Sequence, residues 1–462
     1  MAIHPIDDTI AAIATPPGTG GIGIIRISGP DAEAVFRRIF RPHRPHEIYQ
    51  SHMLYYGSVV DCEGRVLDEV LGVFMKAPKT YTREDVVELH SHGNYLVLQS
   101  ILREIFACGV RSAEPGEFTK RAFLAGRIDL TGAEGVIELL KAQTAGAAEM
   151  AVEQLQGRLY EMIETVRNAL AEILAVIEVA IDFPDEDVEI IDRELLLLQL
   201  KERVEVPLRE LIKSAEHGKI IREGIKAVIV GCPNVGKSSL LNGLLREDRA
   251  LVTAIPGTTR DTIEEIVSIH SLPVRIVDTA GIREHADPVE ELGIDRTRKK
   301  LAEADLVLFM VDGSTLPGKD DLALYRSMNP ANCLVVINKI DKADPGILEQ
   351  VGAFFSEADQ VEISAKQLVG IDRLRDMLYE KVTGSSAIKE YNSCAPNTRH
   401  RVALEKALAA SLRLKDILLN GLPADLAAVE VQCGLGELGD IVGLTTPDDI
   451  LDKIFSEFCI GK

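Results

Sequence analysis

The stretch Lys226–Ser238, KAVIVGCPNVGKS, decides the fold of the middle of this 462-residue chain. Its apolar run, Lys226–Val230, predicts a buried strand, and the residues from Ser238 onward predict a helix, so Gly231–Gly236 is the loop between them. In such a loop the backbone N–H groups and the helix N-terminus bind phosphates, Lys237 reaches the β and γ oxygens, and the Ser238 hydroxyl ligates Mg2+. The stretch therefore predicts a P-loop nucleotide site.

Three further motifs follow in the order and spacing of a GTPase: DTAG from Asp278, NKID from Asn338 and SAK from Ser364. Asp278 ends a second apolar run, where its carboxylate can reach the Mg2+ shell and the N–H of Gly281 can contact the γ-phosphate. Asp341 can accept hydrogen bonds from the N1–H and the 2-amino group of guanine, which adenine does not offer. The four motifs together predict GTP rather than ATP.

The loop TAIPGTTRD, which begins at Thr253, lies between the first two motifs. Thr259 is expected to complete the Mg2+ shell that Ser238 begins, and the loop should order when the γ-phosphate binds and relax after hydrolysis. The residues expected to contact GTP are Asn234, Val235, Gly236, Lys237, Ser238, Ser239, Thr253, Ala254, Ile255, Pro256, Gly257, Thr258, Thr259, Asp278, Thr279, Ala280, Gly281, Asn338, Lys339, Asp341, Ser364, Ala365 and Lys366.

The residue after DTAG raises the question of how water is activated. Ras-like enzymes orient the attacking water with a glutamine at this position, but Ile282 cannot form a hydrogen bond. Another group must do so, and the acids of the following stretch, REHADPVEELG, are the candidates. The residues alone do not choose among Glu284, Asp287, Glu290 and Glu291, and no arginine finger can be assigned from spacing.

Composition limits the classes of protein. The first ten residues, MAIHPIDDTI, do not resemble a signal peptide, and no apolar run approaches the roughly 18 residues that span a bilayer. Seven cysteines without a CxxC pair favour a reducing, cytoplasmic location over a disulfide framework or a zinc site. The net charge of −21 argues against tight RNA binding by this chain alone, although it leaves a role in RNA chemistry open.

The pattern along the chain predicts a multidomain α/β protein with three parts. Residues 1–125 mix short strands, Gly/Pro turns and a helix near Leu96–Ala107, which predicts a small α+β domain. Residues 126–220 and 383–462 are helical, with long amphipathic helix over Thr131–Ile181 and a break at Phe183-Pro184. The Ras-like G domain, a doubly wound sheet over residues 221–382, is therefore expected to be inserted into an all-α domain.

Two patterns in the first domain invite a different interpretation. Gly18–Gly23 matches GxGxxG, but a strand-like run follows where a dinucleotide site requires a helix. Glu88, His90 and His92 alternate on one strand face, for which a polar strand edge or ligand pocket is favoured over a metal site. The last residues, FCIGK, carry Cys459; a lone cysteine is ordinarily a small buried apolar residue, but a functional thiol stays open here.

The chain resembles the MnmE (also called TrmE) family of bacterial and organellar tRNA modification GTPases. The resemblance runs from end to end: ATPPGTGGIGIIRISG from Ala14, YTREDVVELHSHG from Tyr81, AEPGEFTKRAFLAGRIDL from Ala113, the G motifs with TAIPGTTRD, and CIGK from Cys459. The glycine loop near the start and the CIGK segment distinguish the family from other translation-associated GTPases.

The resemblance implies a homodimer that works with a flavin-dependent partner, MnmG (GidA), as a heterotetramer on tRNA. Together they install a carboxymethylaminomethyl or aminomethyl group at C5 of the wobble uridine of certain tRNAs. The one-carbon unit would come from 5-formyltetrahydrofolate or another tetrahydrofolate derivative bound to a folate-binding-like N-terminal domain. The family dimerises through that domain, and K+ acts where other GTPases use an arginine finger.

The resemblance also assigns residues by motif. The K+ ligands would be Asn234, Thr253, Ile255 through its carbonyl, and Thr258; Glu290 would orient the water; Arg26, Glu88, Arg127 and Lys462 would bind folate; Cys459 would be linked to modification. Many relatives carry lysine where this chain has Arg127, which keeps the charge but alters its geometry.

Two other functions remain open. The chain could be a GTP switch that assembles ribosomal or other RNA particles without group transfer, in which case the N-terminal domain has no reason to bind a reduced folate. A third possible function is a folate-dependent methyltransferase regulated by GTP. The sequence argues against it because it shows no second substrate pocket.

Overall fold

The computed structural model describes residues 8–45, 47–182, 192–248, 264–278, 304–383 and 394–462. The chain forms two compact units. The first comprises residues 1–137, 154–200 and 409–462, and the second comprises residues 138–153 and 201–408. Each unit is described below by itself.

The first unit begins with a seven-stranded sheet in the order β3-β4-β5-β6-β2-β1-β7. Neighbouring strands are antiparallel except β1 and β7, which are parallel. The strands are β1 (Ile10–Ile13), β2 (Gly20–Ser28), β3 (Phe40–Pro42), β4 (Met53–Val60), β5 (Val66–Met75), β6 (Val86–Gly93) and β7 (Arg111–Ser112).

Helices α1 (Ala32–Ile39) and α2 (Tyr95–Ala107) contribute to the core of this sheet. The side chain of Asn94 accepts a hydrogen bond from the N–H of Leu96 and so begins α2, close to the predicted position. A third helix, α3 (Glu117–Leu124), follows β7. The expected α+β character of this region is confirmed.

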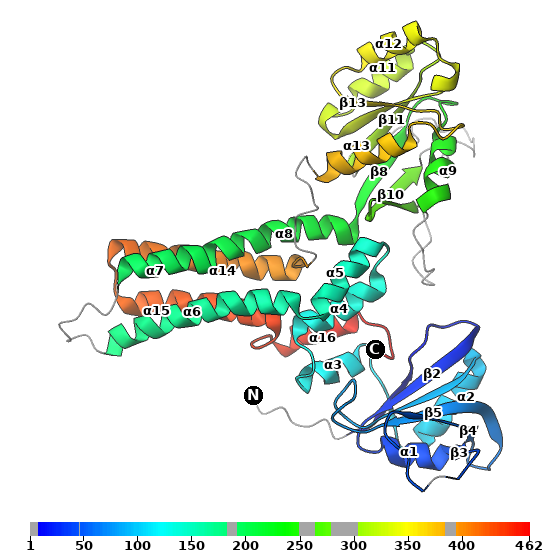
Figure 1. Ribbon diagram of the computed structural model, residues 1–462, viewed down its shortest axis with the longest axis vertical. Helices are drawn as coiled ribbons and strands as arrows, with labels where there is room; N and C mark the ends of the chain where they lie inside the picture. Colours follow the sequence, from blue (N-terminus) through cyan, green and yellow to red (C-terminus); the bar gives the residue numbers. More distant parts are fainter. Residues whose placement is uncertain (1–7, 46, 183–191, 249–263, 279–303, 384–393) are drawn as a thin grey trace. The chain divides into compact units, whose positions relative to one another are not determined.

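The helices of the first unit include α6 (Arg158–Asp182) and α15 (Ala424–Val442), which pack along each other (Figure 1). Helices α7 (Arg193–Leu200) and α16 (Asp448–Ser456) belong to the same unit. Three helices cross from one unit to the other along the chain: α4 (Leu130–Lys141), α5 (Ala145–Leu155) and α14 (Thr398–Asn420).

The long helix expected over Thr131–Ile181 is divided, which corrects that prediction. It consists of α4, α5 and α6, with interruptions at residues 142–144 and 156–157. Gly157 at the second interruption has a φ of 85°, a conformation that a side chain disfavours and that ends α5. The apolar periodicity of these helices is visible in the sequence, but their two short interruptions are not.

The second unit contains the G domain, a six-stranded sheet in the order β13-β12-β11-β8-β10-β9. Only the β9–β10 pair is antiparallel. Its strands are β8 (Ile225–Val230), β9 (Glu264–Ile269), β10 (Leu272–Asp278), β11 (Leu306–Asp312), β12 (Cys333–Asn338) and β13 (Asp359–Glu362). Its helices are α9 (Lys237–Asp248), α11 (Lys319–Arg326), α12 (Pro345–Phe354) and α13 (Ile371–Thr383), and α8 (Val206–Glu223) precedes the sheet after a short π-helical turn over Lys201–Glu205.

Both faces of the G-domain sheet are covered. Along β11, Leu308 and Met310 belong to one buried cluster, whereas Phe309 and Val311 belong to another. Successive residues of a strand point to opposite faces, so two cores lie on the two sides of the sheet. This is the doubly wound arrangement predicted for the Ras-like G domain.

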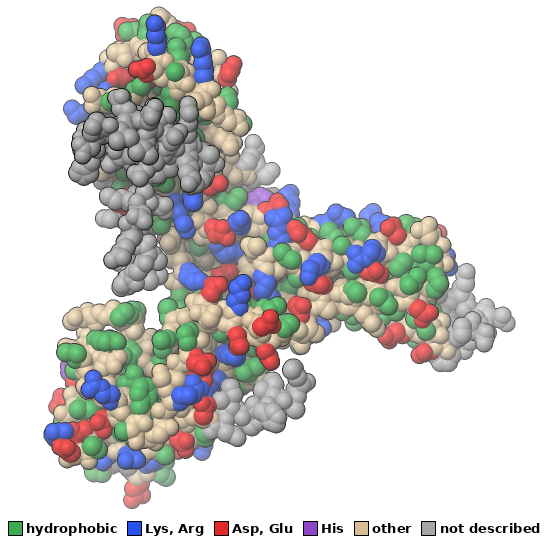
Figure 2. All heavy atoms as spheres, turned by 180° about the vertical axis from the view of Figure 1, so that it is seen from behind, with side chains coloured by type: hydrophobic (Ala, Val, Ile, Leu, Met, Phe, Trp, Pro, Cys, Tyr) green, Lys and Arg blue, Asp and Glu red, His purple; other side chains and the backbone are tan. Residues whose placement is uncertain are grey.

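Charge is distributed without one dominant sign on the visible surface. On the face drawn in Figure 2, lysine and arginine side chains lie interspersed with aspartate and glutamate side chains. Within the described ranges, no helix is both long enough and apolar enough to cross a membrane.

Candidate functional site

The phosphate-binding loop joins β8 to α9, as predicted. Gly236 has a φ of 105°, and a Cβ at this position would collide with Nδ2 of Asn338. A Cβ at Gly231 would collide with the carbonyl oxygen of Met310 in the neighbouring strand. Both glycines are therefore required by close approach of the loop to β11 and β12.

Lys237 is the first residue of α9, and its ammonium lies over the loop. Its Nζ donates to the carbonyl oxygens of Gly231 at 3.0 Å and Cys232 at 2.9 Å. Ser238 and Ser239 are exposed at the start of this 12-residue helix. A helix N-terminus with a lysine and two hydroxyls beside it attracts phosphate and offers oxygen to a divalent cation.

The guanine motifs are tied to the phosphate loop by one buried side chain. Asn338, 3% exposed, donates from Nδ2 to the carbonyl oxygen of Val235 at 2.7 Å and accepts from the N–H of Ala365 at 2.9 Å. Ser364 donates to Asp341 at 2.6 Å. The P-loop, NKID and SAK segments thus meet at the carboxyl ends of the central strands, where ligands of doubly wound sheets bind.

Two other members of these motifs have defined positions. Lys339, with a φ of 67°, forms an ion pair with Asp312 at 2.6 Å. Burial raises the pKa of Asp312, but hydrogen bonds from Lys339 and Ser314 outweigh it and hold that pKa below its ordinary value. Lys366 is exposed.

Asp278 is the last residue of β10 and lies opposite Ile229 of β8, directly beside the strand that leads into the loop. The other predicted contacts lie outside the described residues: Thr253, Ala254, Ile255, Pro256, Gly257, Thr258, Thr259, Thr279, Ala280, Gly281 and the candidate catalytic Glu290.

A second candidate site lies in the first unit, where β2 and β6 pair with Arg26 opposite Glu88. Nε of Arg26 donates to Glu88 at 2.8 Å, and Nη1 donates to the carbonyl oxygen of Gly461 at 3.3 Å. The guanidinium also lies 5.6 Å from the ring centre of Phe118 and 5.8 Å from that of Tyr81. Charge and aromatic surface therefore converge at one point.

The segment Cys459–Lys462 completes this second site. Ile460 forms a β-bridge with Pro115, and the N–H of Phe118 donates to the carbonyl oxygen of Lys462 at 3.2 Å. Gly461 has a φ of 95° and lies so close to Ile13 of β1 that no Cβ would fit. The end of the sequence is thereby docked against its first strand.

Lys462 belongs to the charge cluster of Arg26 and Glu88. Burial and the nearby Arg26 lower the pKa of Lys462, and Glu88 and Cys459 partly offset that shift. The Cys459 side chain is exposed, so the expectation of a buried apolar cysteine is wrong.

Arg127, the fourth predicted folate position, also lies near the Tyr81 ring. Its guanidinium is 5.1 Å from the Tyr81 ring centre, and it lines a pocket of about 470 Å3. Tyr81 therefore contacts both Arg26 and Arg127. The four positions that the resemblance selected are brought into one region by β2, β6, the residues after α3 and the docked segment.

The patterns that invited another interpretation are resolved by the strands. The glycine stretch continues into β2 rather than into a helix, which excludes a dinucleotide fingerprint there. His90 lies 3.3 Å from Glu88, but His92 pairs instead with Asp68. Among the residues with described positions, no group of three acids, histidines or cysteines is arranged to hold a metal ion.

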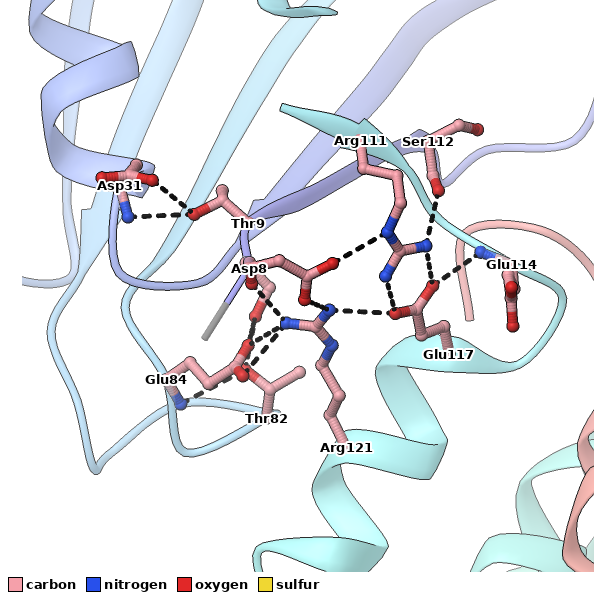
Figure 3. A network of polar contacts seen from close by, with 11 residues as sticks. Asp8, Thr9, Asp31, Thr82, Glu84, Arg111, Ser112, Glu114, Glu117 and Arg121 are labelled. Carbon is pink, nitrogen blue, oxygen red and sulfur yellow. Dashed lines mark hydrogen bonds and ion pairs between the residues drawn. The ribbon is translucent and has the colours of Figure 1, made fainter. Parts of the chain in front are cut away.

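Sequence reasoning missed a buried ion network that positions α3 (Figure 3). Arg121, 2% exposed, forms ion pairs with Asp8 at 2.7 Å, Glu84 at 3.1 Å and Glu117 at 2.9 Å, and Arg111 also pairs with Asp8 and Glu117. Burial raises the pKa of both Asp8 and Glu117, but their arginine partners outweigh it, and both values lie below the ordinary range. The network fixes the helix that carries Phe118.

The sequence analysis also overlooked Tyr81 and Phe118 as individual site residues. Both lie within motifs that carried the family resemblance, YTRED and PGEFTKR. The motifs therefore pointed to this region, but they did not show which of their residues belong to the site. The hydroxyl groups of Tyr81 and Thr119 are hydrogen-bonded at 2.9 Å, and this contact holds the Tyr81 ring in place.

Comparison with known proteins identifies the family. A model of the MnmE helical domain matches residues 130–459, and one of the GTP-binding protein TrmE N-terminus matches residues 9–127. A tRNA modification GTPase MnmE of Desulfotalea psychrophila is 52% identical, with 100% of both chains covered, and one of Syntrophotalea carbinolica is 46% identical, with 99% of both covered. A crystal structure of Era from Aquifex aeolicus bound to GDP.AlF4- is 27% identical over 41% of this chain and 67% of that chain, with a TM-score of 0.28. The full-length identity and the two family models together show that this chain belongs to the MnmE family of tRNA modification GTPases.

Proposed function

We propose that this GTPase is stimulated by K+ and works with a flavin-dependent partner, MnmG, on the wobble uridine of certain tRNAs. The pair would attach a carboxymethylaminomethyl or aminomethyl group at C5, using a one-carbon unit from a tetrahydrofolate derivative. The observation that carries the proposal is the 52% identity, over the full length of both chains, to a relative named a tRNA modification GTPase.

GTP would be held by the P-loop and the guanine motifs. Lys237 would contact the β and γ phosphates, and Asp341, oriented by Ser364, would accept from the guanine base. Asn338 would keep the base-binding segments in register with the loop through its two buried hydrogen bonds. The geometry fits a guanine nucleotide because the P-loop, whose N–H groups would donate to the phosphates, and the exposed carboxylate of Asp341 lie at the same sheet edge.

Two cations would accompany the nucleotide. Ser238 and Thr259 would ligate Mg2+, and Asn234, Thr253, Ile255 and Thr258 would ligate K+. The described part of this set fits, since Ser238 and Asn234 are exposed in the loop that would hold phosphate. When bound, K+ supplies positive charge where negative charge builds between the β and γ phosphates.

Glu290 would orient the attacking water in place of a Ras-like glutamine. Glu290→Ala should slow K+-stimulated hydrolysis about 100-fold or more, because a positioned base contributes about 10²–10⁴-fold. Glu291→Ala, its neighbour in the same stretch, is the matched control. Equal rates for the two variants would mean that another group orients the water.

The second site fits a reduced folate. Glu88 suits the amino and N–H groups of a pterin, and Arg26, Arg127 and Lys462 suit carboxylates. Tyr81 and Phe118 add aromatic surface beside Arg26. When bound, the folate would supply the one-carbon unit, and the exposed Cys459 thiol would lie beside it.

Partner, tRNA and dimer formation complete the proposal. With a net charge of −21, the chain would leave most tRNA contacts to MnmG, in a heterotetramer built on a homodimer that forms through the N-terminal domain. The second candidate function, a GTP switch acting on RNA particles without group transfer, is less favoured. It gives no reason for Arg26, Glu88 and Lys462 to converge.

One preparation tests the main features. GTP hydrolysis is measured in K+ and in Na+, and binding of 5-formyltetrahydrofolate is recorded on the same sample. Stimulation by K+ together with folate binding is the expected result. Indifference to the cation with no folate bound would favour the GTP switch.

A further inference from the structure

A pocket in the first unit lies beside the candidate folate site. Its volume is about 470 Å3, within the range of about 300–1,000 Å3 typical of small-molecule sites. Its lining residues are His52, Met75, Pro78, Lys79, Thr80, Tyr81, Arg83 and Arg127. They come from the position just before β4, the end of β5, the loop after β5, and the residues just after α3.

The charges that line this pocket have one sign. Lys79, Arg83 and Arg127 contribute three cations, and no aspartate or glutamate is among the lining residues. The neighbouring acids are engaged elsewhere, since Glu84 pairs with Arg121 and Asp85 accepts from the N–H of Ala77. Unopposed cations on a concave surface attract a ligand that carries several negative charges.

One of the cations, and the backbone that carries a second, are held by contacts that involve no acid. Nη1 of Arg83 donates to the carbonyl oxygen of Ala125 at 2.8 Å, which leaves its other nitrogens available. The ring of His52 lies within 2.9 Å of the carbonyl oxygen of Lys79, which fixes the backbone from which the lysine projects. The backbone that carries the pocket is therefore fixed, whereas the side chains of Lys79, Arg83 and Arg127 are exposed to solvent.

Tyr81 connects this pocket to the candidate folate site. One guanidinium beside its ring is that of Arg26, which pairs with Glu88, and the other is that of Arg127, which lines the pocket. A ligand with its heterocycle near Glu88 and its aromatic middle section near Tyr81 would direct its carboxylate end toward the pocket.

We infer that the pocket binds the polyglutamate tail of a folate. Folates carry a chain of γ-linked glutamates, and each added glutamate contributes one more carboxylate. A polyglutamate tail therefore matches the three cations of this pocket better than a single glutamate does. The inference rests on the proposed folate site and names the form of folate that this site prefers. An RNA phosphate backbone is the competing ligand, but it would need a broad basic surface rather than a pocket of this size.

The test compares 5-formyltetrahydrofolate carrying one glutamate with the same compound carrying three, by calorimetry on the full-length chain at low ionic strength. Two extra carboxylates facing partly exposed cations should tighten binding about 2- to 30-fold. Lys79→Gln, alone and with Arg83→Gln, should remove most of that advantage and leave the affinity for the monoglutamate unchanged. Lys76→Gln is the matched control, because Lys76 is exposed in the same loop but does not line the pocket.

The outcomes separate the inference from the proposed function. Equal affinities for one and three glutamates would overturn the inference and leave the folate site standing, whereas no binding of either compound would overturn both. The inference would also be overturned if the triglutamate still bound more tightly than the monoglutamate in Lys79→Gln and in the double variant. The same holds if these variants lost affinity for tRNA but kept the preference for the triglutamate. The single Lys79→Gln variant keeps the test decisive if Arg83→Gln disturbs the fold.

Discussion

Replacing Asn338 by alanine should loosen the nucleotide-free G domain as well as weaken guanine binding. The side chain is 3% exposed and bridges two segments, donating to the carbonyl oxygen of Val235 and accepting from the N–H of Ala365. Alanine removes both of these hydrogen bonds and has no polar side-chain atom to replace them. Two buried backbone groups then lack partners.

The expected magnitude follows from that geometry. Each buried backbone group left without a hydrogen bond costs about 1–3 kcal/mol, so Asn338→Ala should lower local stability by about 2–6 kcal/mol. The loss should concentrate where the P-loop meets the SAK segment, since local openings in a protein have their own free energies.

Amide hydrogen exchange on the nucleotide-free chain measures this directly, with the N–H of Ala365 as the reporter. Asn338→Ala should speed exchange at Ala365 by about tenfold or more for each 1.4 kcal/mol lost. Asn332→Ala, an exposed asparagine in the turn before β12, is the matched control and should leave that amide unchanged. A loss below about 1 kcal/mol at Ala365 would refute the reasoning.

Three further predictions concern the first unit. Arg121→Gln should cost about 1–3 kcal/mol at pH 7, measured by urea unfolding, because the buried Glu117 loses one of its two arginine partners while Arg111 still pairs with both Glu117 and Asp8. Both acids have a lowered pKa in the folded state, so the wild type gains stability above the unfolded-state pKa of about 4 and loses it as pH falls through the folded-state values. The variant should keep the part of this dependence that Arg111 supports and lose the part that Arg121 supports. Gly461→Ala should weaken folate binding about tenfold with unchanged GTP turnover, since its φ of 95° and the adjacent strand exclude a Cβ; an unchanged folate affinity would contradict the docking. Because burial lowers the pKa of Lys462, affinity for the folate anion should begin to fall with rising pH below the usual lysine value of about 10.4, and Lys462→Gln should flatten that titration.

The G domain was predictable because its motifs stand at the ends of apolar strands. The run Lys226–Val230 forms β8 within one residue of its expected bounds, and Asp278 ends β10 as predicted; a doubly wound sheet brings such strand ends to one edge. The role of Asn338 as a buried bridge was not predictable, because the sequence gives no sign that residue 338 lies against the carbonyl of residue 235.

The second site depended on contacts between distant parts of the chain. Strand alternation put Glu88 and His90 on one face, which the structure confirms, but no periodicity pairs Arg26 with Gly461. The network around Arg121 was equally hidden, since a lone arginine on a helix is ordinarily solvated and only the fold reveals the three acids around it. The family resemblance assigned these residues to one site, whereas the local sequence pattern gave no reason to place them together.

The docking of Cys459–Lys462 against the first strand has a consequence for biosynthesis. Arg26 and the carbonyl of Gly461 are 435 positions apart, and ribosomes add about 5–20 residues per second. Arg26 is therefore synthesised roughly 20–90 s before the segment that completes its ligand site, and the whole G domain is made in between. A nascent or truncated chain without this segment would have a folded P-loop but an incomplete folate site in its first domain. Folate binding would therefore distinguish chains that have been translated through this segment from those that have not.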